Sequence, residues 1–400
     1  MTTKKRVIAV FTGNRAEYGL QFPILRAVAR HPDLEYRLLV SGAHLDKNFG
    51  TTLDEIRKDG FEIHDEIRID LAADTLYATA QAIGTGIISV SKSLERIRPD
   101  IFVVYADRFE GFAAVIASTQ MGIPTAHIEG GDVTQGGALD DSVRHAMTKL
   151  AHLHFTTNEN AANRVRQMGE EAWRVFNVGF PAIDLIADGV FATPQELHDR
   201  FRIDPDRPLI VFTQHSVTTR FQDSVSHVVP SLAALEVLAG EGAQVVITYP
   251  NNDAGGRRII EELERFRARG IPNIQVHKSV GRYNYHGMLQ QAGRGGRTGG
   301  ACAGNSSSGV KETPAFGCPS VDIGSRQSGR LGAGNVIATG YDEAEIIAAL
   351  RRCLTDSTFI EQCRTCDNPY GTGDAGRKIA EVLATVALDQ ALITKQMTIP

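Results

Sequence analysis

Unbroken apolar runs constrain the fold of this chain more than any other feature. The runs at 7–11, 101–105 and 209–212 carry apolar residues at consecutive positions. Side chains of a strand point alternately to its two faces, so a strand without a polar face must be covered on both sides. Longer stretches with the apolar spacing of amphipathic helices lie between these runs. The alternation predicts an α/β protein built on parallel sheets.

The alternation occurs twice along the chain. In the first half we expect strands at 6–11, 36–40, 101–105, 125–128 and 154–156, and helices at 17–30, 76–96 and 108–121. In the second half we expect strands at 209–213, 244–248, 274–276 and 320–323, and helices at 224–238, 257–269, 308–316 and 343–353. Glycine, proline and small residues cluster between the halves, at 179–194.

A chain of 400 residues has the length of two domains. We therefore predict two doubly wound α/β domains with a cleft between them. Residues 1–185 form the N-terminal domain and residues 186–373 the C-terminal domain. Residues 374–400 form a last helical segment that crosses back to the first domain.

Charge and composition exclude several classes of protein. The net charge is −5 and no basic block is present, so neither nucleic acid nor an anionic membrane surface is an expected partner. No apolar run approaches the ~20 residues of a membrane span, and the run at 7–11 is too short for a signal peptide. Five cysteines, an odd number, indicate reduced thiols and a cytoplasmic protein. Cys363 and Cys366 form a lone pair, whereas zinc needs four ligands, so no metal is expected.

Ligands of open parallel sheets bind beyond the carboxyl ends of the strands, so the residues after each expected strand are the first candidates. Arg15 follows the first strand and begins a helix, a combination that suits a phosphate group. A pairing of Arg15 with Glu17 or a surface acid explains the residue equally well. The turn lacks G-x-G-x-x-G, so no dinucleotide cofactor is expected.

Three acids follow other strands of the first half. Asp107 follows 101–105, Glu129 follows 125–128, and Asp140 opens a helix with Arg144 one turn further on. Taken singly, Asp107 is more simply a turn residue and Asp140 an N-cap whose ionised form Arg144 favours. Together in one cleft, they would suit the removal and donation of protons.

The second half contains a candidate phosphate site. The segment GNSSSG at 304–309 offers a free backbone, hydroxyl groups and the start of a helix, although a serine-capped loop is the simpler interpretation. His215 follows the strand at 209–213 and Arg326 follows the strand at 320–323. An isolated histidine is more often structural than catalytic.

These segments, in this order, resemble the hydrolysing UDP-N-acetylglucosamine 2-epimerases. The resemblance covers nearly the whole chain and is specific as a combination. The matching segments are TGNRAEY at 12–18, SGAHL at 41–45, Asp107-Arg108, HIEGG at 127–131, DDSVRH at 140–145, QHSVTT at 214–219, GNSSSG at 304–309 with Glu312, and GSRQSGR at 324–330.

The resemblance implies a two-domain GT-B architecture and a function. Members convert UDP-N-acetylglucosamine and water to N-acetylmannosamine and UDP, at the entry to sialic acid synthesis, without metal or redox cofactor. By resemblance, Asp107, Glu129 and Asp140 match the catalytic acids, with His215 beside them. Residues that match diphosphate or nucleotide ligands are Arg15, His215, Ser306, Ser307, Glu312 (toward the ribose hydroxyls) and Arg326; further cleft residues are His44, Arg108 and Arg144. A homodimer or homotetramer is expected.

Two segments depart from the family pattern. The loop between Glu129 and Asp140 is longer, with extra residues at 135–137, and the segment 293–302 is rich in glycine and arginine. Both are expected beside the site. They leave open the same chemistry on a UDP- or GDP-linked 2,4-diacetamido-2,4,6-trideoxyglucose, as in legionaminic acid synthesis. A GT-B glycosyltransferase and a catalytically silent nucleotide-sugar sensor also stay open as functions.

Overall fold

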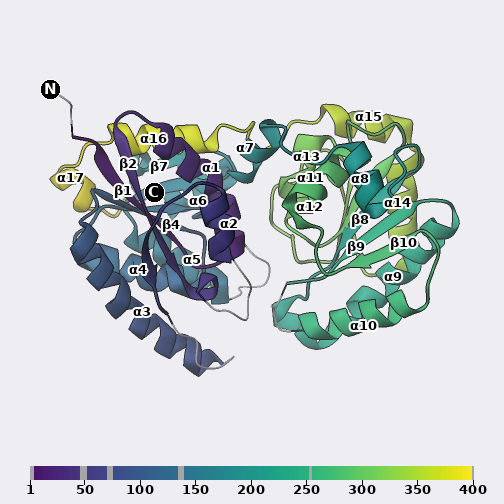
Figure 1. Ribbon diagram of the computed structural model, residues 1–400, viewed down its shortest axis with the longest axis horizontal. Helices are drawn as coiled ribbons and strands as arrows, with labels where there is room; N and C mark the ends of the chain where they lie inside the picture. The colour runs from purple at the N-terminus through teal and green to yellow at the C-terminus, as the bar shows by residue number, and fades with distance from the viewer. Residues whose placement is uncertain (1–3, 46–51, 70–74, 134–138, 252–254, 399–400) are drawn as a thin grey trace. The chain divides into compact units, whose positions relative to one another are not determined.

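The computed structural model describes residues 4–45, 52–69, 75–133, 139–251 and 255–398, which form two compact units (Figure 1). Unit 1 comprises the described residues within 1–132, 139–185 and 370–400, and unit 2 comprises those within 133–138 and 186–369. Unit 1 is therefore discontinuous in sequence, because all but one short piece of unit 2 lies between Leu185 and Tyr370.

Unit 1 is built on a seven-stranded sheet in the order β3-β2-β1-β4-β5-β6-β7, in which neighbouring strands are parallel. The strands are β1 (Arg6–Thr12), β2 (Leu34–Ser41), β3 (Ile63–Ile67), β4 (Ile101–Tyr105), β5 (Thr125–Ile128), β6 (Leu153–Thr156) and β7 (Val175–Asn177). The helices are α1 (Arg15–Arg30), η1 (Gly42–His44), α2 (Thr52–Lys58), α3 (Leu76–Ile97), α4 (Phe109–Gln120), α5 (Leu139–Leu150), α6 (Glu159–Gln167), η3 (Ala172–Arg174), α7 (Ala182–Ala187), α16 (Ala375–Thr385) and α17 (Gln390–Ile393).

Helices cover both faces of this sheet, as the unbroken apolar runs require. Ile8 and Val10 of β1 pack with α1 and α16, whereas Ala9 and Phe11 pack with α3 and α4 on the other face (Figure 1). All four side chains are buried. Full burial of a large aliphatic or aromatic side chain contributes about 1.5–3 kcal/mol to the free energy of folding. Burial against helices on both faces therefore stabilises β1 in the sheet.

Helix α16 packs against α1 through a close approach of the two backbones. A Cβ at Gly376 would lie 2.6 Å from the carbonyl oxygen of Pro23, so a glycine is required there. The carboxylate of Asp184 accepts the N–H groups of Ala375 and Gly376, at 3.0 and 2.7 Å. These bonds satisfy free donors at the start of α16 and place a negative charge at the positive end of its dipole.

Unit 2 repeats the design with a six-stranded parallel sheet in the order β10-β9-β8-β11-β12-β13. The strands are β8 (Leu209–Thr213), β9 (Gln244–Thr248), β10 (Ile274–His277), β11 (Gly300–Gly304), β12 (Ser320–Ile323) and β13 (Val336–Thr339). The helices are α8 (Pro194–Phe201), η4 (Thr218–Asp223), α9 (Ser224–Gly240), α10 (Gly256–Ala268), α11 (Gly281–Ala292), α12 (Ser308–Lys311), α13 (Thr313–Phe316), α14 (Glu343–Thr355) and α15 (Ser357–Thr365).

The predicted fold class is confirmed, because both units are doubly wound around parallel sheets. The nine predicted strands correspond to β1, β2, β4, β5, β6, β8, β9, β10 and β12. Strands β3, β7, β11 and β13 were not predicted. In the part of the chain that the structure describes, no helix is long and apolar enough to span a bilayer. All five cysteines are free thiols within unit 2.

The glycine- and arginine-rich segment 293–302, expected beside the functional site, runs into β11. Residues 293–299 precede the strand at its amino end, whereas ligands bind at carboxyl ends. Its glycines serve close packing of backbones. A Cβ at Gly296 would lie 2.0 Å from the carbonyl oxygen of Gln291, and a Cβ at Gly300 would lie 2.5 Å from the Cα of Ala292.

Replacing Gly300 with alanine should destabilise unit 2. The new Cβ would lie within 2.8 Å of the Cα, Cβ and carbonyl oxygen of Ala292, which belong to a packed helix. Overpacking of this kind costs about 1–3 kcal/mol, so denaturant unfolding should show a lower midpoint. Gly240→Ala at the end of α9 is the control, because nothing lies within 4 Å of its new Cβ. Equal midpoints for the two variants would contradict the expectation.

Candidate functional site

Both sheets reverse their strand order next to the first strand of the unit, between β1 and β4 in unit 1 and between β8 and β11 in unit 2. Ligands of α/β proteins bind outside the carboxyl ends of the strands at such a reversal. The predicted residues follow these strands. Arg15 comes after β1, Asp107 after β4, His215 after β8, and Ser306 and Ser307 after β11.

In unit 1, the guanidinium of Arg144 holds the carboxylate of Asp107. The same guanidinium donates to Oδ1 of Asp141 at 2.6 Å and to the carbonyl oxygen of Asp132 at 3.0 Å. The side chain of Arg144 is only 4% exposed, so these charges meet away from water. Removing one partner of a buried ion pair costs about 3–5 kcal/mol. The Asp107 carboxylate is therefore fixed in place.

Asp140 does not take the N-cap position that the sequence predicted. Helix α5 already includes Leu139, so Asp140 lies in its first turn and is exposed. Asp141, which the sequence did not single out, is a buried acid that pairs with Arg144. Residues three and four apart both share a helix face, so the spacing suited either acid.

Two turns of this edge contain non-glycine residues with a left-handed backbone. Ala106, just before Asp107, has φ of 56°, and Glu129, just after β5, has φ of 68°. Each costs about 1–2 kcal/mol, which the surrounding contacts must offset. The ring of His127 supplies such contacts. Its Nε2 lies 2.6 Å from the carbonyl oxygen of Ala106, and its Nδ1 lies 3.1 Å from the hydroxyl of Thr148.

Glu129 lies at the carboxyl end of β5 and is only 8% exposed. Burial, followed by the neighbouring carboxylates of Glu129 and Asp132, raises the pKa of Tyr105 well above its ordinary value. The Tyr105 hydroxyl therefore keeps its proton and remains a hydrogen-bond donor beside Glu129. The extra loop residues 135–137 lie outside the described residues.

Glu17 and Glu110 form a buried carboxyl pair at the turn after β1, and neither residue was predicted. Oε2 of Glu17 accepts the N–H of Gly13 at 2.8 Å. Glu110 passes so close to the turns that a Cβ at Gly13 would lie 3.1 Å from its Cβ, and a Cβ at Gly42 would lie 2.9 Å from its Oε1. Gly42 also has φ of 56°, a second reason for glycine.

This carboxyl pair retains a proton at neutral pH. Burial, and then the charge of Glu110, raises the pKa of Glu17 to about 8. Burial also raises the pKa of Glu110, although Nε of Arg108 lies 3.6 Å from its Oε2 and opposes the shift. A buried carboxylate near a second one is harder to ionise, because burial and the like charge both disfavour its charged form.

The other predicted residues of unit 1 lie around the same turn. Arg15 is the first residue of α1, behind the N-cap Asn14, and its side chain lies outside the described residues. His44 is buried, with Nε2 3.1 Å from the hydroxyl of Thr12, and burial lowers its pKa to about 4, so its ring is neutral. Arg108 is about half exposed.

In unit 2, Asn305 joins the three turns that carry the predicted residues. Its Oδ1 accepts the backbone N–H of His215 at 2.6 Å, and its Nδ2 donates to the carbonyl oxygen of His215 at 2.9 Å. Its own carbonyl oxygen accepts from Arg326 at 3.2 Å and from Gln327 at 2.8 Å. The side-chain amide and the backbone carbonyl of buried Asn305 thus hold the turns of His215, Arg326 and the adjoining Ser306 together.

His215 presents a neutral ring with a defined tautomer. Burial, followed by the charge of Arg326, lowers its pKa to about 3. The backbone N–H of Asn251 donates to Nδ1 at 3.1 Å, so the ring proton resides on Nε2. His215 therefore offers an N–H donor that carries no charge.

The serine turn after β11 is held by local hydrogen bonds. Oγ of Ser306 accepts the N–H of Ser308 at 3.4 Å, and Ser307 directly precedes α12. Glu312 follows α12, and its Oε2 lies 3.1 Å from Nε2 of His286. His286 was not predicted, because it stands in the middle of α11 with no motif around it.

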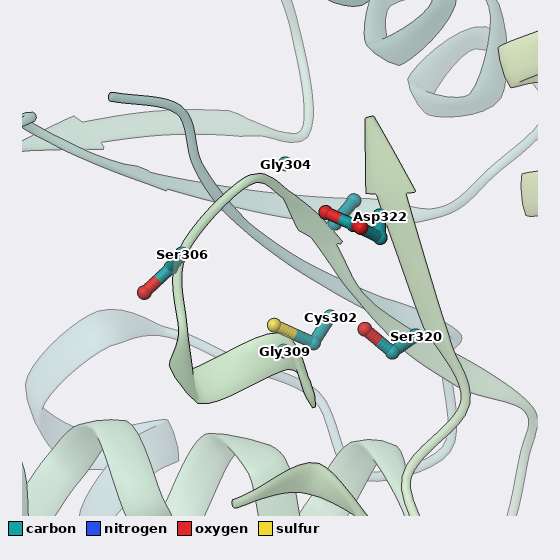
Figure 2. A pocket seen from close by; sticks show the side chains of 7 residues that line it. Cys302, Gly304, Ser306, Gly309, Ser320 and Asp322 are labelled. Carbon is teal, nitrogen blue, oxygen red and sulfur yellow. The ribbon is translucent and has the colours of Figure 1, made fainter. Parts of the chain in front are cut away.

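A small pocket adjoins the serine turn, and Figure 2 shows Cys302, Ser306, Ser320 and Asp322 around it. Burial raises the pKa of Asp322 to about 6, although Arg330 and Arg326 oppose the shift. Asp322 was not predicted as a site residue. It pairs in register with Gly304 on β11, and that register brings its carboxyl group to the start of the serine turn.

The two units offer complementary chemistry. Unit 1 supplies carboxyl groups in different environments: one paired with arginine, one beside a tyrosine hydroxyl, and two buried ones whose pKa values are raised. Such differences suit the removal and return of protons. Unit 2 supplies hydroxyl, N–H and guanidinium donors, which suit an anion. Among the described residues, no group of three or more His, Cys, Asp or Glu side chains could hold a metal ion.

Comparisons with known proteins point to one family. The family model described as UDP-N-acetylglucosamine 2-epimerase matches residues 26–384. A UDP-N,N'-diacetylbacillosamine 2-epimerase (hydrolyzing) of Legionella pneumophila is 30% identical over 98% of both chains. A UDP-N-acetylglucosamine 2-epimerase of Neisseria meningitidis is 30% identical over 95% of both chains. The crystal structure of a UDP-GlcNAc 2-epimerase from Neisseria meningitidis, bound to UDP-GlcNAc, has a TM-score of 0.79 at 19% identity and covers 94% of this chain and 99% of its own.

Replacing Glu17 with glutamine should make unit 1 more stable at high pH. The pKa of Glu17 is raised in the folded protein. The stability that its protonation contributes is therefore present in full below the ordinary pKa of glutamate. This stability is lost as the pH rises through about 8. Glutamine cannot ionise, yet it can still accept the N–H of Gly13. Thermal unfolding of variant and parent should therefore diverge in favour of the variant from pH 5 to pH 9. The exposed Glu95→Gln is the control, and parallel curves for Glu17→Gln would refute the raised pKa of Glu17.

Proposed function

The chain belongs to the UDP-N-acetylglucosamine 2-epimerase family, and from that premise we propose that it is a hydrolysing 2-epimerase. The proposed reaction converts UDP-N-acetylglucosamine and water to N-acetylmannosamine and UDP, for nonulosonic acid synthesis. The observation that carries the proposal is the set of acids at the carboxyl ends of the adjacent strands β4 and β5, where Asp107 and Glu129 stand next to or within strained turns.

The proposed chemistry is an elimination followed by a hydration. A carboxylate removes the proton on carbon 2 while UDP leaves from carbon 1, which gives a 2-acetamidoglucal. Water then adds at carbon 1, and a proton returns to carbon 2 from the opposite face. We assign Asp107 as the first base, because Arg144 fixes its position, and Glu129 and Asp140 to protonation and hydration. Acids in different environments support this division of roles.

Unit 2, together with Arg15, is proposed to stabilise the leaving diphosphate. Ser306, Ser307 and Arg326 supply donors, and Nε2 of His215 supplies an N–H whose presence follows from its tautomer. A very weak carbon acid makes this stabilisation essential, since charge develops on the leaving group in the transition state. Glu312, oriented by His286, is assigned to the ribose hydroxyls.

A second candidate substrate is the UDP- or GDP-linked 2,4-diacetamido-2,4,6-trideoxyglucose. The Legionella pneumophila relative favours this substrate, because its name refers to a UDP-linked diacetyl sugar. That relative is as similar to this chain as the Neisseria meningitidis relative is. The chemistry would be the same, since both sugars carry an acetamido group on carbon 2.

Turnover in heavy water should test the reaction type and the substrate together. Carboxylic acids exchange protons with solvent, so the released sugar should carry one deuterium at carbon 2 and have the manno configuration. The panel should include UDP- and GDP-linked forms of both sugars, with products identified by mass and NMR. Release of a gluco sugar would mean simple hydrolysis, and retention of the original hydrogen would mean transient oxidation. Either result would refute the proposal.

Amide variants of the acids should separate catalysis from binding. Glu129→Gln and Asp140→Asn should lower turnover by on the order of 100-fold or more, because an amide cannot carry the proton. UDP affinity, measured by calorimetry, should stay nearly unchanged. The exposed Glu95→Gln on α3 is the matched control and should turn over like the parent. An equal loss of turnover and UDP affinity would show that the acids are structural.

A further inference from the structure

Residues 390–398, here called the C-terminal strap, lie against the β6–β7 edge of unit 1. Arg174, whose side chain is fully buried, donates to the carbonyl oxygens of Leu392 at 2.7 Å and Ala391 at 2.5 Å. The backbone N–H of Thr398 donates to the carbonyl oxygen of Gly169 at 3.0 Å. The strap is therefore held along its length by groups that come more than 200 positions earlier in the chain.

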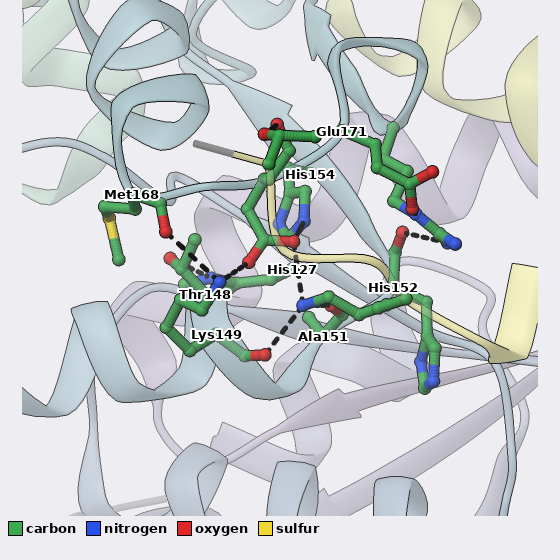
Figure 3. Close-up of polar contacts among 12 residues, drawn as sticks. His127, Thr148, Lys149, Ala151, His152, His154, Met168 and Glu171 are labelled. Atoms are coloured by element: carbon green, nitrogen blue, oxygen red, sulfur yellow. Dashed lines mark hydrogen bonds and ion pairs between the residues drawn. The ribbon is translucent and has the colours of Figure 1, made fainter. Parts of the chain in front are cut away.

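Lys395 of the strap reaches the end of helix α5. Its Nζ donates to the carbonyl oxygens of Lys149 and Ala151, each at 2.6 Å, and lies 2.8 Å from Oε2 of Glu170 (Figure 3). An ammonium group has three N–H donors, and each of them has a partner here. The side chain of Lys395 is only 17% exposed, so these contacts are largely shielded from water.

Glu170 anchors this ammonium group. Its buried carboxylate also contacts Nε2 of His154 at 2.9 Å and Nζ of Lys149 at 2.5 Å (Figure 3). Although burial alone would raise it, the hydrogen bonds from His154 and the two lysines lower the pKa of Glu170 to about 2. The carboxylate is therefore ionised at neutral pH, where it pairs with the ammonium group of Lys395.

The two carbonyl groups bound by Lys395 stand at the C-terminal end of α5, where a helix has free acceptors and the negative end of its dipole. The opposite end of this short helix carries Asp140 and Asp141, and Arg144 lies in its middle. A helix advances about 1.5 Å per residue, so Arg144 lies only about 8 Å along the axis from Lys149. A shift of the capped end thus moves the residues that hold Asp107.

We propose that Lys395 is a positioning residue: by capping the C-terminal end of α5, it fixes the helix that places Asp140 and the Arg144 partner of Asp107. The inference rests on the proposed function, in which these two acids handle protons. Displacements of about 1 Å in a catalytic group can cost up to 100-fold in rate. Loss of the cap therefore lowers kcat while the groups of unit 2 that bind the nucleotide are untouched.

The test compares Lys395→Met with Lys378→Met. The first removes all three donors and keeps an unbranched side chain of similar length, while the second removes an exposed ion pair on α16 that does not touch α5. We measure kcat, KM, UDP affinity and amide hydrogen exchange of residues 139–150. Lys395→Met should lower kcat by about tenfold or more, with KM and UDP affinity within about twofold, and speed exchange in α5. Lys378→Met should match the parent in all four.

Two further variants keep the test decisive. Lys395→Arg retains the charge and should recover most of the lost kcat. If Lys395→Met does not fold, Lys395→Gln takes its place. It should lower kcat and speed hydrogen exchange in α5 in the same way, but by smaller amounts. Unchanged kcat with faster exchange in α5, or a loss of kcat that only tracks the folded fraction, overturns the proposal. If the parent enzyme itself releases no epimerised sugar, the proposed function fails, and the exchange data alone decide whether Lys395 holds α5.

Discussion

Covering both faces of a parallel sheet leaves its strands no polar side, and this constraint governs the rest of the molecule. The central strands β1 and β4 are buried along most or all of their length, so charged side chains can meet there only where the strands end. The reversal of strand order beside β1 and β8 then determines which ends become neighbours. Asp107 and the carboxyl pair Glu17 and Glu110 gather at one reversal, and His215, Asn305 and the serine turn at the other.

The apolar runs predicted nine strands because valine and isoleucine mark buried strands in any context. They could not predict β11, whose sequence Gly-Ala-Cys-Ala-Gly has no β-branched residue. Its small side chains are required by its position, since Gly300 meets Ala292 at a distance that admits no Cβ. The edge strands β3 and β7 were missed for a different reason. Both are only partly buried, and the polar residues that they carry interrupt the apolar run.

The positions of the candidate residues followed from the strand ends, but their partners did not. Glu17 and Glu110 are far apart in sequence, and the approach of Glu110 to this turn depends on Gly13 and Gly42, which leave room for its side chain. The ion pair of Arg144 with Asp141 likewise did not follow from the spacing, because Asp140 and Asp141 both share a helix face with Arg144. Asn305 was noticed only as part of a serine-rich segment, although its side-chain amide and its backbone carbonyl together connect three turns.

The discontinuity of unit 1 has a consequence for biosynthesis. Glu170 and Arg174 are made before unit 2, whereas Lys395 and the carbonyl groups that Arg174 binds are made after it. At translation speeds of about 5–20 residues per second, the 184 residues between Leu185 and Tyr370 occupy the ribosome for roughly 10–40 s. During that time a nascent unit 1 has two buried charges without their final partners and an uncovered α1. Chaperones that recognise exposed apolar surface would therefore meet this half of the protein first.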